Sequence, residues 1–306
     1  MLMKFINIIK IRSNGYILAT LLLAFNSSLY AHPFLWKATG EHEFYLFGTI
    51  HLPDPRVTDV PEEVAQALEE STSFYAELDL NESNTMMIKQ SMWLPEKKTL
   101  HDYLPEKLEE RIEDYLQEVN PKLNLEFFVQ QKIWVLAITL TVLEQQLKYP
   151  GQAALDAVLF DKAMSMGLKT GGLETVKEQL SVFESMSENQ QIAFLADTVD
   201  FMQATKSQNN DFIEESLNAY LQGDLDRLMT YLMSYMKDNE FYDQLLERLI
   251  NQRNYKMAQS IQQLVSENTS EKYFFAIGAG HFWGDSGINT LLKEKGYSIE
   301  RIETIK

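Results

Sequence analysis

Two histidines, His51 and His281, occupy the same place in two similar stretches of sequence near opposite ends of the chain. Residues 45–52 read YLFGTIHL and residues 273–281 read YFFAIGAGH, so each apolar run is followed by Gly, two residues and His. Such runs predict buried strands, and a glycine at the strand exit lets the backbone turn or approach a ligand. Ligands of α/β sheets bind at the carboxyl ends of strands. We therefore expect the two histidines to share a site, although either one alone could simply cap a turn.

Two acidic residues stand in comparable positions. Glu77 falls in a predicted core strand, residues 73–80, where an unpaired carboxylate would be costly. Glu174 falls at the end of a short predicted strand, residues 168–175. Glu77 therefore requires a cation or a set of hydrogen-bond donors close by, and Glu174 is placed at a strand end like the two histidines.

Two histidines and a carboxylate form a set that can bind a first-row divalent metal and leave positions open for water and substrate. A metal held in this way favours hydrolysis, because it lowers the pKa of bound water and polarises a carbonyl group. We expect His51, His281 and Glu77 to hold the metal, with Glu77 or Glu174 as ligand or general base. Arg253 is a catalytic candidate that could stabilise an oxyanion or bind a substrate carboxylate, and its alternative is a surface cation.

The kind of metal site is restricted by what the sequence lacks. No cysteine is present, so neither a disulfide nor a thiolate metal site can form, and the ligands must be nitrogen and oxygen atoms. The zincin pattern His-Glu-x-x-His is also absent. Any site must therefore be assembled from strands that are distant in the sequence.

The elements that would position these residues fall into α/β ends and a helical middle. The pattern predicts a hairpin over 34–38 and 43–47, and it predicts a long helix, a strand, a helix and an edge strand over 240–267, 273–278, 288–295 and 297–302. Residues 84–239 carry helical spacing, including an amphipathic helix over 154–166. We expect an α/β fold whose central sheet is built from the N- and C-terminal segments, with a large helical insertion at about 84–239 that covers the cleft.

The first residues have the pattern of a secretory signal peptide. Lys4, Lys10 and Arg12 precede an apolar run, small residues follow it, and cleavage is expected after Ala31. We thus expect residues 1–31 to be a signal peptide and residues 32–306 to be a single periplasmic or secreted domain. An uncleaved anchor is the alternative, but the apolar run is shorter than the roughly 20 residues that a spanning helix needs. Loss of the three cations would change the net charge from −17 to −20, which disfavours nucleic acid and anionic membranes as partners.

The motifs together resemble those of the TraB/PrgY/GumN family, which includes the TIKI proteases. The resemblance rests on residues 48–52, 76–79, 172–175 with Gln179, 253–254 and 278–281 with Gly284, in the order of the family. It implies a fold like that of the erythromycin esterase and ChaN group and, in the TIKI branch, metalloprotease activity supported by manganese or cobalt. His51, His281 and Glu77 match the central functional set of the family, and Glu174 and Arg253 match further positions. The second motif reads Gly-His-Phe-Trp, where many relatives have leucine after the histidine.

Two functional interpretations remain open on the sequence. In the first, the chain is a metal-dependent hydrolase that acts on a peptide or protein, uses manganese, cobalt or zinc, and has no stable membrane insertion after signal cleavage. In the second, the same cleft holds haem or iron through a histidine, or binds a peptide without cutting it. A third interpretation, in which both histidine turns are incidental, assigns the residues no shared site.

Overall fold

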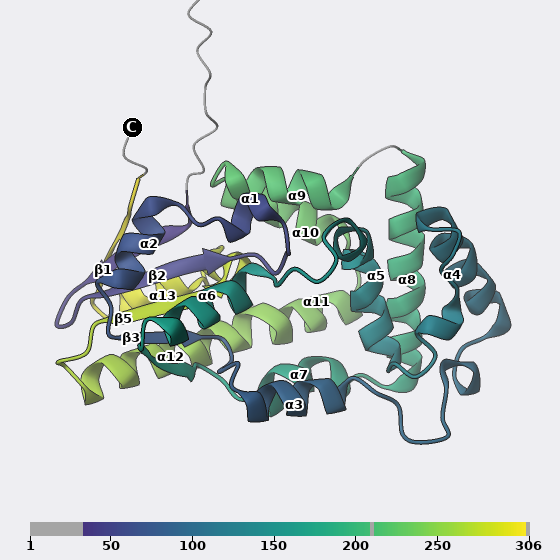
Figure 1. The fold of residues 1–306 in the computed structure, drawn as a ribbon, viewed down its shortest axis with the longest axis horizontal. Coiled ribbons are helices and arrows are strands. Elements are labelled where there is room, and N and C mark those ends of the chain that lie inside the picture. The colour runs from purple at the N-terminus through teal and green to yellow at the C-terminus, as the bar shows by residue number, and fades with distance from the viewer. Residues whose placement is uncertain (1–32, 209–210, 304–306) are drawn as a thin grey trace, which may run out of the picture.

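A six-stranded sheet lies at one end of the protein, at the left of Figure 1. The computed structural model describes residues 33–208 and 211–303. The strands are β1 Leu35–Thr39, β2 Phe44–Thr49, β3 Ser73–Ala76, β4 Lys169–Gly172, β5 Tyr273–Gly278 and β6 Ser298–Arg301. Their order is β4-β3-β5-β2-β1-β6, in which β4, β3, β5 and β2 are parallel neighbours, and β1 is antiparallel to both β2 and β6.

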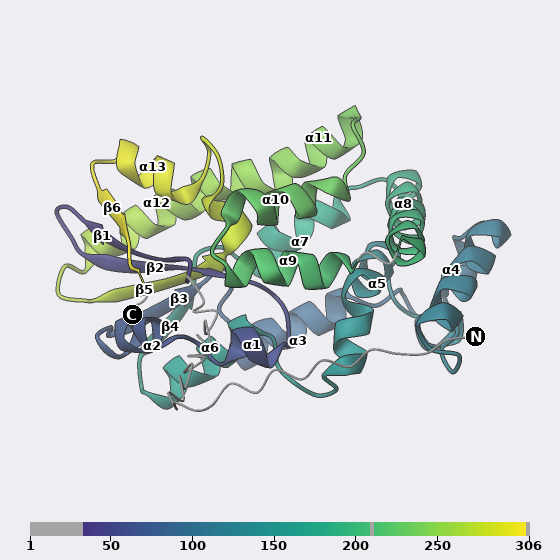
Figure 2. The same cartoon turned by 90° about the horizontal axis from the view of Figure 1, so that it is seen from above.

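Helices cover both faces of this sheet. The helices α1 Pro55–Thr58, α2 Glu62–Glu69 and α6 Leu155–Ser165 lie on one face, and α12 Gln252–Glu267 and α13 Ile288–Glu294 lie on the other (Figure 2). The sequence of β5 suits this environment, because residues 274–277 form an unbroken apolar run that is almost fully buried. Strands that are covered on both faces have such continuous runs rather than an alternation of apolar and polar residues.

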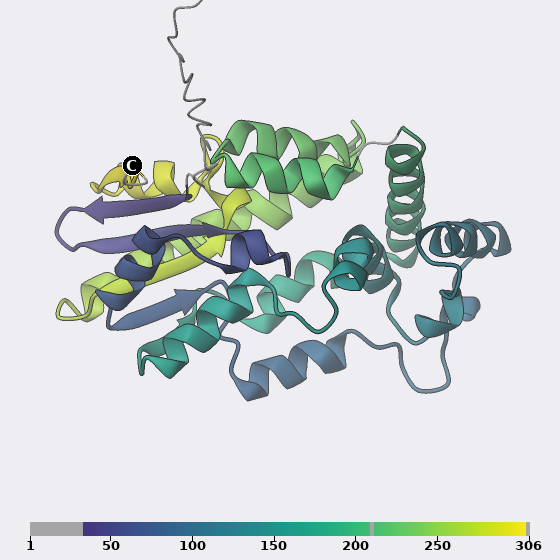
Figure 3. The same ribbon diagram turned by 45° about the horizontal axis from the view of Figure 1, so that its top comes forward.

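A large helical portion extends beyond the carboxyl ends of the parallel strands (Figure 3). Its helices are α3 Glu82–Ser91, α4 Glu106–Val119, α5 Ile133–Lys148, α7 Val176–Glu184, α8 Glu188–Ser207, α9 Phe212–Leu221, α10 Leu225–Ser234 and α11 Glu240–Leu246. Short 3-10 turns occur at Leu100–Asp102, Leu125–Phe127 and Ala279–Phe282. Apolar side chains of α4, α5, α7 and α8 form a second core that is separate from the core of the sheet.

The predicted α/β class is confirmed, with a sheet drawn mainly from the two ends of the chain and a large helical portion between them. One strand of the sheet nevertheless comes from the helical middle, since β4 pairs with β3 at the edge. Gly171 permits this pairing, because a Cβ atom there would lie 2.3 Å from the ring of Tyr75. The middle of the chain is thus tied to the sheet and is not a purely helical insertion.

The predicted strand over residues 73–80 was too long. β3 ends at Ala76, and residues 77 and 78 form a bend. Backbone pairing with the segment after β4 continues briefly, as Leu173 N–H donates to the Ala76 carbonyl and Glu174 N–H donates to the Glu77 carbonyl. Glu77 therefore stands just past a strand end and is not inside a strand.

The predicted signal peptide, residues 1–31, lies outside the described residues. None of the helices formed by residues 33–208 and 211–303 is long and apolar enough to cross a membrane.

Candidate functional site

The ends of three parallel strands meet at one edge of the sheet. Thr49 of β2 pairs with Gly278 of β5, and Ala76 of β3 pairs with Ala276 of β5. Since the three strands run in the same direction, the residues that follow them emerge side by side. This edge receives His51 after β2, His281 after β5 and Glu77 after β3.

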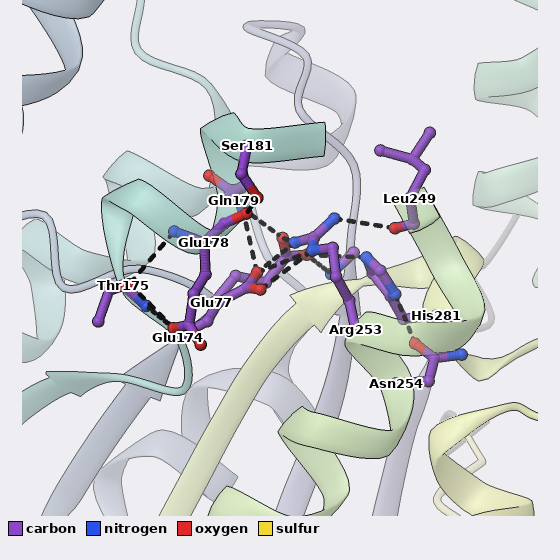
Figure 4. Close-up of polar contacts among 11 residues, drawn as sticks. Glu77, Glu174, Thr175, Glu178, Gln179, Ser181, Leu249, Arg253, Asn254 and His281 are labelled. Carbon is purple, nitrogen blue, oxygen red and sulfur yellow. Dashed lines mark hydrogen bonds and ion pairs between the residues drawn. The ribbon is translucent and has the colours of Figure 1, made fainter. Parts of the chain in front are cut away.

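Glu77 is a buried carboxylate surrounded by donors (Figure 4). Gly278 N–H donates to its Oε1 at 2.7 Å, and Gln179 Nε2 of α7 and Arg253 Nη2 of α12 donate to its Oε2 at 2.9 and 2.5 Å. Burial alone would raise the pKa of Glu77, but the neighbouring His281 imidazole, the Arg253 guanidinium and His51 lower it to about 2. Glu77 is therefore ionised at neutral pH.

Arg253 joins Glu77 to Glu174. Its Nε donates to both carboxylate oxygens of Glu174, at 3.0 and 3.1 Å, and its Nη2 contacts both glutamates. Burial, together with the charge of Glu77, raises the pKa of Glu174 despite the hydrogen bonds from Arg253. Two buried carboxylates thus share one guanidinium, and with both ionised the group carries one surplus negative charge that a further cation would balance.

The helix that carries Arg253 has an irregular turn immediately before it. Residues 240–267 form one continuous helical rod, as the sequence predicts, but Glu247–Asn251 is a π-helical turn between α11 and α12. Leu249 in this turn accepts a hydrogen bond from Arg253 Nη1 at 3.1 Å. Single π turns inside α-helices often occur at functional sites. The turn precedes two successive residues, Arg253 and Asn254, that both contact the site.

His281 is held in one orientation by Asn254. The His281 Nδ1 atom lies 2.6 Å from Asn254 Oδ1, and Asn254 Nδ2 donates to the Ser286 carbonyl at 2.9 Å, which directs the amide oxygen to the imidazole. His281 is only 5% exposed, and this burial lowers the pKa of His281 to about 4. The ring is therefore neutral, with its proton on Nδ1 and a lone pair on Nε2, 3.7 Å from Glu77 Oε1.

His51 is held in a similar way by a residue that the sequence analysis did not identify. Its Nδ1 lies 2.6 Å from Oδ2 of Asp156, in the first turn of α6, and Thr49 Oγ1 donates to the other carboxylate oxygen at 2.5 Å. The charge of Asp156 raises the pKa of His51 to about 9, and the His51 side chain is 65% exposed. The sequence signal that could have identified Asp156 is an acidic residue in the first turn of an otherwise largely apolar helix. The same signal is expected for an acid that only stabilises the helix N-terminus.

The space in front of Gly278 is bordered by all three candidate ligands. A Cβ atom on Gly278 would lie 3.0 Å from Glu77 Oε1, 3.6 Å from His281 Cδ2 and 4.0 Å from His51 Nε2. In the part of the chain that the structure describes, no three His, Asp or Glu side chains already stand close enough to ligate one ion. The donor chemistry nevertheless fits a metal, because metal-binding histidines typically have their second ring nitrogen fixed by a carboxylate or carbonyl oxygen. Asp156 and Asn254 provide those oxygens here.

The two glutamates that are catalytic candidates differ in their distance from the histidines. Glu77 is the carboxylate within 4 Å of His281, whereas no nitrogen of His51 or His281 lies that close to Glu174. Arg253 directs its guanidinium to the two glutamates and to a backbone carbonyl. Its place in the fold therefore suits the orientation of Glu77 rather than free contact with a substrate oxyanion.

Comparison with known proteins gives one family and several curated relatives. The model of the TraB/PrgY/gumN family matches residues 34–301. The chain is 28% identical over 312 residues to "Metalloprotease TIKI2" of Danio rerio, covering 87% of this chain and 60% of the relative. It is 27% identical to "Metalloprotease TIKI1" of Homo sapiens, covering 87% and 61% of the two chains. The chain thus spans about three fifths of the length of these relatives. No solved structure gives a significant match, so the predicted likeness to the erythromycin esterase and ChaN fold stays a prediction.

Proposed function

Since the chain belongs to the TraB/PrgY/gumN family, we propose that it is a metal-dependent hydrolase that cleaves peptide bonds. The observation that carries the proposal is the shared arrangement of the two motif histidines. Each has its Nδ1 atom fixed by an oxygen, and both border the space in front of Gly278 beside the buried carboxylate of Glu77. Curated relatives that are named metalloproteases support the same class of reaction.

In this proposal His51, His281 and Glu77 hold the metal. Manganese, cobalt or zinc would accept two imidazole nitrogens and one carboxylate oxygen. When bound, such an ion supplies Lewis acidity for the hydrolysis of an amide bond. The surplus negative charge of the group formed by Glu77, Glu174 and Arg253 favours a cation at this place.

The residues of the chain prepare the site in three ways. Asn254 keeps the proton of His281 on Nδ1, so that its Nε2 lone pair faces the site. Asp156 fixes the ring of His51 by accepting a hydrogen bond from Nδ1, so that Nε2 is the nitrogen that would give up its proton to bind a metal. Arg253 holds Glu77 in its ionised form, in which the carboxylate can act as a ligand or accept a proton.

The proposed substrate is a peptide or protein, and the proposed location is the periplasm or the extracellular space. The location rests on the signal-peptide pattern of residues 1–31. Mass spectrometry of the exported protein tests it, with an N-terminus at or near His32 expected. A mature N-terminus at Met1 in a cytosolic fraction would contradict the proposal.

One experiment tests the cofactor and the reaction together. Purified protein would be assayed for bound metals by elemental analysis and for cleavage of a peptide library with and without added manganese, cobalt or zinc. We expect metal-dependent cleavage that is lost in His51→Ala and in His281→Ala. His42→Ala is the matched control, because His42 lies in the turn before β2, at the opposite end of that strand from His51.

The same preparation distinguishes the alternative binding function. Haem bound through a histidine would give a Soret absorbance that disappears when His51 or His281 is replaced. Metal binding and cleavage that both persist in the double variant would refute the proposed site.

A further inference from the structure

A second polar cavity lies directly beside the proposed active site. It has a volume of about 140 Å³ and is bounded by one face of α7 and by the rod formed of α11, the π turn and α12. Its walls are formed by Glu174, Glu178, Ser181, Val182, Ser185, Arg248, Gln252, Arg253 and Lys256. Glu174 and Arg253 belong both to these walls and to the group that holds Glu77. The cavity and the proposed metal site are therefore separated by one layer of side chains.

The three basic side chains that line this cavity differ in whether they have an acidic partner. Arg253 is paired with two glutamates, and Lys256 lies 3.5 Å from Glu178. Arg248 is different, because its contacts are the Ser185 hydroxyl at 2.7 Å and the Gln244 carbonyl at 3.2 Å, which are both neutral. Among the residues that the structure describes, no carboxylate oxygen lies within 4 Å of the Arg248 guanidinium.

An arginine without an acidic partner is notable in a chain whose net charge is −17. Its planar guanidinium can bind a carboxylate through two parallel hydrogen bonds, and only part of its donor capacity is used by Ser185 and Gln244. Glu174 and Glu178 also line the cavity and would repel a doubly charged anion such as phosphate. The charged side chains that line the cavity itself, three basic and two acidic, sum to one positive charge. Within the described ranges, Arg248 is the one among them without a partner of opposite charge, which suits a single carboxylate.

We propose that this cavity is a substrate subsite that binds a carboxylate group of an acidic peptide through Arg248. The carboxylate would come from the C-terminus of the peptide or from an aspartate or glutamate side chain. This inference rests on the proposed peptidase function for its catalytic consequence, but the binding of the carboxylate itself does not depend on catalysis. Because Glu174 and Arg253 line the cavity, the residues next to the anchored carboxylate would lie against the side chains that hold Glu77.

Direct binding tests the subsite without any turnover. The metal-free protein would be titrated by calorimetry with three otherwise identical N-acetylated peptides, one with an internal glutamate, one with glutamine in its place, and one with glutamine and an amidated C-terminus. We expect the loss of the recognised carboxylate to weaken binding about tenfold or more, the usual scale for a hydrogen bond to a charged group. The step at which affinity falls identifies the side chain or the C-terminus as the source.

Substitution then assigns the effect to Arg248. Arg248→Gln should remove the preference between the charged and uncharged peptides, whereas Arg248→Lys should retain part of it. Lys293→Gln on α13 is the matched control, because it changes the charge equally at an exposed position of another element. Equal affinities of the wild type for all three peptides, or a preference that survives Arg248→Gln, would overturn the subsite.

The results also distinguish a failure of the proposed subsite from a failure of the proposed peptidase function. In cleavage assays, a subsite of this kind predicts that Arg248→Gln lowers the ratio of kcat/KM for the recognised peptide to kcat/KM for its uncharged analogue. Carboxylate-dependent binding without any cleavage would support the subsite and count against the peptidase function. Cleavage with no discrimination by charge would support the function and overturn the subsite.

Discussion

Gly278→Ala places a methyl group in the space that the proposed metal must use. The new Cβ would lie 3.0 Å from Glu77 Oε1, 3.6 Å from His281 Cδ2 and 4.0 Å from His51 Nε2. Metal–ligand distances are about 2.0–2.2 Å, so an ion that contacts these three side chains would occupy much of the same volume. The substitution therefore obstructs the site without removing any ligand.

The fold should tolerate this change. Gly278 has φ −50° and ψ 133°, which alanine adopts without strain. Alanine also restricts the unfolded chain, which stabilises a protein by about 0.4–1 kcal/mol and offsets the small shift required of the Glu77 carboxylate. We expect the free energy of unfolding to remain within about 1 kcal/mol of the wild-type value.

Metal affinity should fall much more. Disturbing the surroundings of metal ligands typically costs about 10–100-fold in affinity, which corresponds to about 1.4–2.8 kcal/mol. Calorimetric titration with manganese or cobalt measures this loss, and urea denaturation measures the stability. Gly280→Ala is the matched control, because its Cβ would meet Met229 Sδ at 3.4 Å, the end of a flexible side chain outside the site. Unchanged metal affinity in Gly278→Ala would refute the placement of the ion between these side chains.

Three further predictions concern the ion pairs. Arg253→Met leaves two carboxylates buried without their cation, so we expect a loss of about 3–5 kcal/mol in denaturant titrations, and a loss below about 1 kcal/mol would contradict this. Asp156→Asn removes the charge that raises the pKa of His51 to about 9, so the pKa measured by NMR should fall toward about 6.5; if it did not move, another group would have to be responsible. Burial alone would raise the pKa of Asp54, but hydrogen bonds from Arg56 lower this pKa. The pair therefore stabilises the protein at pH values above the unfolded pKa of about 3.9, and this stabilisation is lost as the pH falls through the pKa of the folded state. Arg56→Gln also removes the hydrogen bonds to Glu214, whose pKa Arg56 lowers too, so it should cost about 1–3 kcal/mol at neutral pH and progressively less below about pH 4, and a cost that stays constant in acid would count against these pairings.

The sequence by itself determined the elements whose signals are local. The hairpin before His51, the strand before His281, the helix at residues 155–165 and the edge strand near the C-terminus all follow from apolar runs and from the glycines and polar residues that end them. These runs also specified a covered sheet, because β5 has no polar alternation. The positions of His51 and His281 just past strand ends could therefore be predicted without coordinates, whereas Glu77 was expected inside a strand.

Local sequence patterns did not predict where β3 ends or which strand β4 pairs with. Residues 77–80 have the composition of a strand, yet the chain bends after Ala76 as the Glu77 side chain turns to donors from other segments. The short strand before Glu174 was recognisable, but its position at the edge of the main sheet depends on pairing with β3. Strand composition indicates a pleated, buried environment and does not specify the partner.

Only the tertiary structure decided which side chains complete the site. Arg253 contacts Glu174 across 79 positions and Glu77 across 176, and Asp156 meets His51 through the packing of α6 near the end of β2. None of these partners is fixed by a spacing, because hydrogen bonds and ion pairs depend on distances in space that the packing of whole elements sets. The π turn before Arg253 is likewise absent from the helical pattern of its sequence. The chemistry of each residue was thus readable in the sequence, whereas its protonation and orientation were determined by neighbours that only folding brings together.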